Sequence, residues 1–251
     1  MSRDNPAYGM ASGMAKVIIA IIFIVLALVI LSIGHMFVVK INPGYAGVVY
    51  NMSGGVEEKV LYQGWHMISP TKSVTEYPIA TETVYLTKDS REGSPNDDSF
   101  EINTRDGKPV NVDVTYAYHF DSNMLSETYT RFKGQLPQYI QDGIIKNTLK
   151  EVANNISSTF GVMDIYGNRR SELNNEVFMA FRDKLKIYGI VIETFNFSRI
   201  SPDAKTLEAI QRVVDEQNKV EQDKIEKERE KIRAEKKKDD SPKSFPSVGI
   251  N

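Results

Sequence analysis

The sequence predicts an α+β protein with four parts: an N-terminal transmembrane helix, a β-rich unit, an α/β unit and a charged C-terminal helix. Residues 17–39 contain no charged side chain, short runs with strand-like alternation follow, and the second half changes to helical spacing before an almost wholly charged stretch. The predicted limits are 1–16 for an N-terminal tail, 17–39 for the membrane helix, 40–200 for the main domain, 201–238 for the charged helix and 239–251 for a disordered tail.

The apolar run at residues 17–39 begins with Val17 and ends with Val39. At about 1.5 Å per residue, a helix of about 23 residues crosses a hydrocarbon core of about 30 Å. Ile24 and Leu31 lie inside this predicted anchor, and Phe37 lies near its exit. The alternative is a signal peptide, but the apolar character continues past its small-residue cleavage site. We therefore expect a single-pass membrane protein.

Strands are predicted directly after the span, in a β-rich part at about 40–90. Runs at 45–50 and 58–62 flank Ser53-Gly54-Gly55, which is typical of a hairpin. Residues 73–77 and 81–86 also alternate, and the polar stretch 88–99 is typical of a loop. We expect Trp65, Met67 and Ile68 to be core residues rather than residues that dip into lipid headgroups.

The α/β part is expected at about 100–200. Strand-like runs at 100–104 and 110–118 flank Asp106-Gly107, a dipeptide that supplies the positive φ angles of a tight hairpin turn. Apolar residues then recur at helical spacing from 136 to 156 and from 168 to 188, before a further strand at 190–197.

Ser201, Pro202 and Asp203 have the residue types that begin a helix. Ser201 can cap free N–H groups, Pro202 suits the first helical position and Asp203 favours the positive end of the dipole. The apolar points of this helix are few, and they are the predicted self-association residues: Leu207, Ile210, Val214, Ile225 and Ile232.

Several motifs in this order resemble those of the SPFH or band 7 superfamily, which is named for stomatin, prohibitin and flotillin. The matching segments are Asn42-Pro-Gly-Tyr-Ala-Gly-Val-Val-Tyr50, the Gly64-x-His66-x-x-x-Pro70 motif, the Asp106-Gly107 hairpin, residues 188–192 and the Ser201-Pro202 helix start. The resemblance covers about residues 37–235. It implies a β-rich SPFH subdomain, an α/β SPFH subdomain and a coiled-coil helix, with Gly64, His66, Pro70, Asp106 and Gly107 in structural roles.

The single anchor resembles prohibitins and bacterial prohibitin-like partners of a membrane-anchored AAA protease. Stomatins usually enter the membrane through a hairpin segment, and the run at 17–39 lacks the mid-run proline expected there. The resemblance implies a cytoplasmic N-terminus and an extracytoplasmic main domain. One departure is that the charged helix stops near Lys238, which is short for the family.

Composition and motifs indicate no catalytic centre. A net charge of −2 excludes the basic footprint of a nucleic-acid-binding protein, and the absence of cysteine excludes thiolate chemistry. His35, His66 and His119 have no metal-ligand spacing, and Asp97-Asp98 in a loop are more typical of solvated acids than of a cation site. We expect no enzyme activity, no cofactor and no bound metal.

The function expected from these patterns is that of an oligomeric membrane scaffold. Its partners would be membrane lipid, further copies or related SPFH proteins, and a membrane protein such as an AAA protease. Two alternatives remain open: a one-to-one regulator acting through the charged helix at 215–238, and a membrane-tethered hydrolase dependent on His66 or Asp98.

Overall fold

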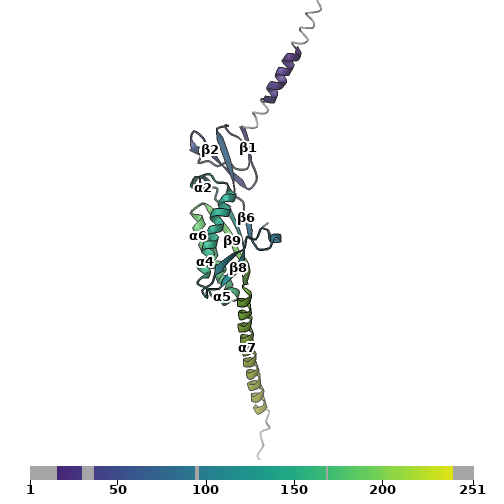
Figure 1. Cartoon of the computed structure of the whole chain (residues 1–251), viewed down its shortest axis with the longest axis vertical. Coiled ribbons are helices and arrows are strands. Elements are labelled where there is room, and N and C mark those ends of the chain that lie inside the picture. Colours follow the sequence, from purple (N-terminus) through teal and green to yellow (C-terminus); the bar gives the residue numbers. More distant parts are fainter. Residues whose placement is uncertain (1–15, 30–36, 94–95, 168, 240–251) are drawn as a thin grey trace, which may run out of the picture.

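The computed structural model describes residues 16–29, 37–93, 96–167 and 169–239. From residue 37 onward the described chain forms a β-rich unit, an α/β unit and a long C-terminal helix (Figure 1). This confirms the α+β architecture expected for that part of the sequence.

Residues 16–29 form a helix with exposed side chains. Leu31 and the rest of 30–36 lie outside the described residues, as do 1–15 and 240–251. No helix within the described ranges combines the length and the apolar character that a membrane crossing requires.

The predicted membrane helix continues too far at its C-terminal end. Val38 and Val39 belong to strand β1 (Val38–Ile41), which pairs antiparallel with β4 (Gly64–Met67). β-branched residues suit a strand, and an unbroken apolar run does not by itself distinguish the end of a helix from the start of a strand.

The β-rich unit contains two small sheets. β1 and β4 form one, and β2 (Tyr45–Asn51) lies between β3 (Gly55–Val56) and β5 (Lys72–Pro78) in the other. The segment predicted to pair with β2, residues 58–62, contributes only a bridge from Leu61, and the long partner of β2 is β5.

Gly47 allows this unit to close. A Cβ at this position would lie 2.5 Å from Cγ1 of Val74 and 2.8 Å from Cδ1 of Ile41. A larger residue would therefore require the side chains of Val74 in β5 and Ile41 in β1 to shift.

The α/β unit has one antiparallel sheet built around β8 (Pro109–Phe120). β9 (Ile190–Pro202) pairs along one side of β8, while β6 (Glu82–Leu86) and β7 (Phe100–Asn103) pair end to end along the other. The predicted hairpin of β7 and β8 is confirmed. β6 falls within the predicted β-rich part at about 40–90, but it pairs with β8 and so belongs to the sheet of the α/β unit.

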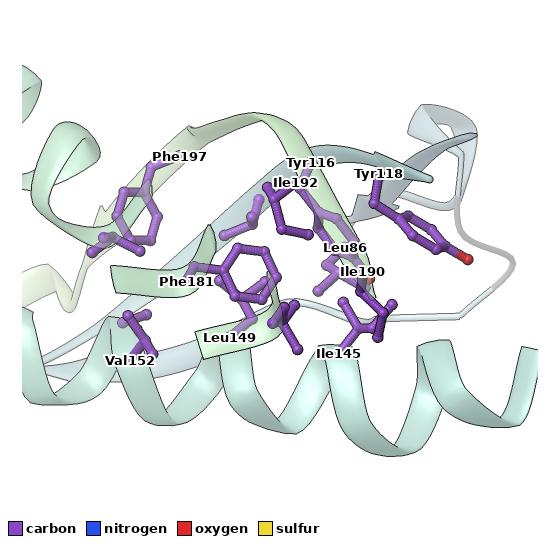
Figure 2. Packing of buried hydrophobic residues seen from close by; sticks show 14 of the residues in the cluster. Leu86, Tyr116, Tyr118, Ile145, Leu149, Val152, Phe181, Ile190, Ile192 and Phe197 are labelled. Carbon is purple, nitrogen blue, oxygen red and sulfur yellow. The ribbon is translucent and has the colours of Figure 1, made fainter. Parts of the chain in front are cut away.

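Helices cover one face of the sheet of the α/β unit (Figures 1 and 2). α4 and α6 lie in the two predicted helical stretches, and a π-helical turn precedes α4. The sequence did not predict α2 and α5, because they are short and lack a clear apolar period. The helices are α2 (Leu125–Arg131), α3 (Pro137–Ile140), the π-helical turn (Gln141–Ile145), α4 (Lys146–Ser157), α5 (Val162–Tyr166) and α6 (Arg170–Lys186).

A continuous core lies between these helices and the sheet. Tyr116 and Tyr118 of β8 point toward the helices, where the Tyr116 ring meets Phe181 of α6 edge to face at 5.6 Å. Burial raises the pKa of both tyrosines above the ordinary value. Alternate residues of β8 thus form one side of the core, as the sequence pattern predicts.

The two units share this core. Tyr77 of β5 packs edge to face on Phe120 of β8 with ring centroids 5.1 Å apart, and its hydroxyl donates to the carbonyl of Gln135 at 2.6 Å. Ser126 donates to the carbonyl of Glu57 at 2.9 Å. These contacts fix the β-rich unit on the α/β unit.

α7 (Ala204–Asp239) extends from the end of the molecule opposite to β1 and β2 (Figure 1). Its predicted start is wrong, because Ser201 and Pro202 continue β9 and pair with Asn111 and Val110. Pro202 is tolerated at the strand end, where its missing N–H costs no ladder bond.

Asp203 begins α7 instead. Its carboxylate accepts bonds from the backbone N–H and the hydroxyl of Thr206, both at 2.8 Å. These bonds lower the pKa of Asp203, with the backbone bond the larger cause. Asp203 therefore has the capping role that the sequence pattern gave to Ser201.

Candidate functional site

Apolar side chains cover the outer face of the β1–β4 strand pair. Val38 lies opposite Met67 and Lys40 opposite Trp65. Trp65 is 72% exposed and Met67 87%, so the expectation that they are core residues is wrong. Cross-strand pairing puts these side chains on one face, and that face has no covering element in the described chain.

Phe37 adjoins this strand pair at the start of β1. Its carbonyl accepts a bond from the N–H of Ile68 at 2.8 Å, and it is 37% exposed. We call Phe37, Val38, Trp65 and Met67 together the hairpin patch.

The residues of the Gly64-x-His66-x-x-x-Pro70 motif lie around this hairpin. His66 Nε2 lies 2.6 Å from the carbonyl oxygen of Tyr62, which can only accept, so the ring nitrogen donates. His66 and Val39 are opposite one another on the less exposed face of the hairpin. Pro70 lies in the exposed turn before β5. This geometry fits a structural role for His66.

The Asp106-Gly107 turn is hydrogen-bonded to the segment that leads into α5. Asp106 accepts a bond from the N–H of Val162 at 2.7 Å, at the start of α5, and Arg105 donates through its N–H to the carbonyl of Phe160. Gly107 has a φ of 68°, whereas Asp106 does not share the positive φ expected of it. The loop is therefore longer than a two-residue turn and needs one left-handed residue.

α7 carries a narrow apolar stripe along its exposed surface. At about 100° per residue, its members fall within about 20° of one line over about 38 Å of helix. Each is between 37% and 49% exposed, and they are Leu207, Val214, Ile225 and Ile232. Ile210 was predicted to belong to this set, but it is only 4% exposed and is already covered.

A cluster of polar side chains lies on the face of the α/β unit's sheet that the helices do not cover. Glu193 accepts from the Thr81 hydroxyl at 2.8 Å and lies 2.6 Å from Nδ1 of His119. A bulge places it there, because Ala117 pairs with Thr194 and Tyr118 with Ile192.

These bonds lower the pKa of Glu193, with the Thr81 bond the larger cause and His119 the next. Thr81 and His119 bind the same carboxylate rather than each other, so the cluster lacks the nucleophile-to-base contact of a hydrolase triad. Sequence reasoning missed it because its members are far apart in the chain and meet only through strand pairing.

A groove runs along β6 on the side facing α3 and α4. It has a volume of about 740 Å³. Its charged lining residues are Glu82, Asp98, Asp142 and Lys146, and Lys146 pairs with Asp98. Asp97 accepts bonds from Ser99. In the described part of the chain, no group of three His, Cys, Asp or Glu side chains is arranged to hold a metal.

The comparisons with known proteins bear on the whole domain. A family model described as "SPFH domain / Band 7 family" matches residues 39–238. No curated protein matches the chain. The matched range begins in β1 and ends in α7, so it covers all three sheets described above and most of the projecting helix.

Proposed function

This chain belongs to the SPFH domain / Band 7 family, and we propose that it is a prohibitin-like oligomeric scaffold on a membrane. Copies stand side by side, with the β-rich units on the bilayer and α7 extending away from it. The assembly organises a membrane patch and encloses a membrane protein, for which a membrane-anchored AAA protease is the proposed client. The proposal assigns the chain no catalytic step and no cofactor.

The observation that carries this proposal is the exposed stripe on α7. A soluble helix normally buries its apolar face, yet these four side chains each remain more than a third exposed. A second α7 at the same height would cover them. Each contact is small, so many anchored copies would gain stability from repetition of the contact.

The charges beside the stripe favour parallel neighbours. Glu221 and Glu228 flank one side of it, and Arg229 and Arg233 flank the other. In a parallel pair the acidic flank of one helix meets the basic flank of the next, whereas an antiparallel pair brings like flanks together. Parallel alignment is also what anchoring in one membrane imposes.

The hairpin patch supports a membrane-facing end. Tryptophan favours the headgroup region, and Lys40 beside it can extend its amine toward phosphate while its stem lies on apolar surface. Phe37 and Val38 of the patch lie at the end of the apolar run that begins at Val17, and we propose the part of this run before the patch as the anchor. From the family resemblance, the N-terminus is proposed to be cytoplasmic and the main domain extracytoplasmic.

Substitution of the stripe tests the proposal. Leu207→Ser, Val214→Ser and Ile225→Ser combined should convert a large assembly to monomers, measured by light scattering of detergent-solubilised full-length protein and by cross-linking in membranes. The matched control is Val213→Ser with Val220→Ser, which removes apolar residues of similar exposure that lie about 110–130° around α7 from the stripe. The control should leave the assembly intact.

Charge exchange gives an independent readout. A Glu221→Arg, Glu228→Arg chain and an Arg229→Glu, Arg233→Glu chain should each assemble poorly alone and should assemble when mixed. A wild-type chain that is monomeric in detergent and forms no cross-links in membranes would instead favour the one-to-one regulator, which needs α7 without self-association.

A further inference from the structure

The outer edge of β6 has no partner strand in the described part of the chain. β6 pairs with β8 alone, from Glu82 opposite Tyr118 to Leu86 opposite Val114. In a strand paired on one side, alternate residues direct their N–H and C=O groups away from the partner. β6 therefore presents a row of backbone donors and acceptors about 17 Å long.

The groove described above lies along this edge. Its far wall comes from α3, the π-helical turn and the start of α4, through Gln138, Gln141 and Asp142. Gly93, Asn96 and Asp98 also line it. π-helical turns recur at functional sites because they displace side chains from regular helical positions.

These walls decide what can reach the edge. An unprotected edge strand can pair with a strand of any size, and proteins usually blunt it with charge, shortness or a covering segment. Here Gln138, Gln141 and Asp142 border a trough of about 740 Å³ along the edge, and Gly93, Asn96 and Asp98 line it as well. A single extended peptide can add to the edge and fill this trough.

The charge of the trough selects the peptide. Three carboxylates, from Glu82, Asp98 and Asp142, face one ammonium group from Lys146, which pairs with Asp98. Glu82 is held by the hydroxyls of Tyr45 at 3.1 Å and Tyr118 at 3.4 Å. Asp142 is exposed on the helical wall.

Side-chain alternation sets the pattern of the peptide. Glu82, Val84 and Leu86 face the helices and are partly or fully buried, while Thr83 and Tyr85 face the open side. An added strand would likewise direct every second side chain toward the wall that carries Asp142. Lysine or arginine at those positions would complement its charge.

We propose that the β6 trough is a docking site for an extended basic segment of a partner protein, which adds to the sheet as a further strand.

A peptide with alternating valine and lysine, seven residues long and fluorescently labelled, provides the probe. Full-length detergent-solubilised protein should bind it with an affinity that falls as salt rises, and should not bind the valine–glutamate version. Two further probes carry N-methyl groups on the valines or on the lysines. Because only one edge of the peptide pairs with β6, one of these two should lose binding.

Asp142→Lys should weaken binding about tenfold, through loss of one attraction and gain of a repulsion. The matched control is Asp183→Lys, which makes the same charge change on the exposed side of α6 and should alter binding less than about twofold. Hydrogen exchange should show that the peptide protects those amides of residues 82–86 that point away from β8. Binding that is indifferent to N-methylation, or that leaves these amides unprotected, would overturn the proposal.

This inference is independent of self-assembly through α7. A chain that assembles but does not bind the peptide would refute only the trough proposal. A monomeric chain that binds it would refute only the scaffold. The two outcomes are therefore distinguishable with one set of proteins.

Discussion

α6 and α7 use apolar residues in opposite ways. In α6, Leu173, Val177, Phe181 and Leu185 recur at four-residue spacing and are all fully buried. In α7, the four stripe residues are spaced more widely and none is less than 37% exposed. One helix completes the core of its own chain, and the other presents an apolar line to the outside.

This difference in burial predicts that α6 residues determine the stability of one copy, whereas the stripe residues of α7 determine assembly between copies. Residues of α6 stabilise the fold through close packing, so their loss should be felt by a single copy. Stripe residues of α7 contribute little to that copy, and their loss should be felt only between copies. The two faces of the β1–β4 strand pair differ in the same way: residues of the less exposed face should affect a single copy, and residues of the exposed face should affect contacts outside it.

The largest expected effect is in α6. Phe181→Ala removes a ring that meets both Tyr116 and Phe195, and it should lower the free energy of unfolding by about 3–5 kcal/mol. Val214→Ser in α7 should change it by less than about 0.5 kcal/mol under conditions where the chain is monomeric. Urea denaturation followed by circular dichroism measures both, and equal losses would contradict the distinction.

A second prediction concerns the hairpin patch, where Trp65 is the only tryptophan of the chain. A patch in the headgroup region places Trp65 at the depth that tryptophan prefers in membranes. In reconstituted vesicles, Trp65 emission should be quenched by lipids labelled near the headgroup more than by lipids labelled at the chain end. Quenching by aqueous iodide alone would place the patch in water.

Local patterns predicted much of the fold because their causes are local. The periods of α4 and α6, and the alternation of β7 and β8, follow from which residues must face a core. The resemblance likewise gave the order of the units correctly. In each of these cases, neighbouring residues carry the whole signal.

The sequence-based predictions were wrong where contacts between distant parts of the chain determine a residue's structure. Trp65 was expected in the core because it is apolar, but no other part of the described chain covers its face of the hairpin. Ser201 and Pro202 have helix-starting residue types, yet pairing with β8 keeps them in a strand. The contact of Glu193 with His119 depends on a bulge, for which the sequence offers no signal.

The start of α7 provides a smaller test. Asp203→Ala removes both bonds to Thr206 and should lower the urea midpoint slightly, mainly through fraying of the first turn of α7. Ser201→Ala should have almost no effect because Ser201 is an exposed strand residue. Hydrogen exchange of the α7 amides distinguishes the two, and a larger effect of Ser201→Ala would restore the cap expected from the sequence.

The smallest expected effect is the pH dependence of Glu193 on the open face of the sheet. Its pKa is lower in the folded chain than the ordinary value of 4.5, because Thr81 and His119 bind the carboxylate form. A carboxylate with a lowered folded pKa binds fewer protons when folded, so its contribution is present above about pH 4.5 and is lost as pH falls through the folded pKa. Because the side chain is 33% exposed, solvent screening keeps that contribution small. Comparing urea midpoints of wild type and Glu193→Gln from pH 3 to 5.5 should show a gap that widens with pH. A gap that stays constant would mean that Glu193 is held by packing of its side chain rather than by its charge.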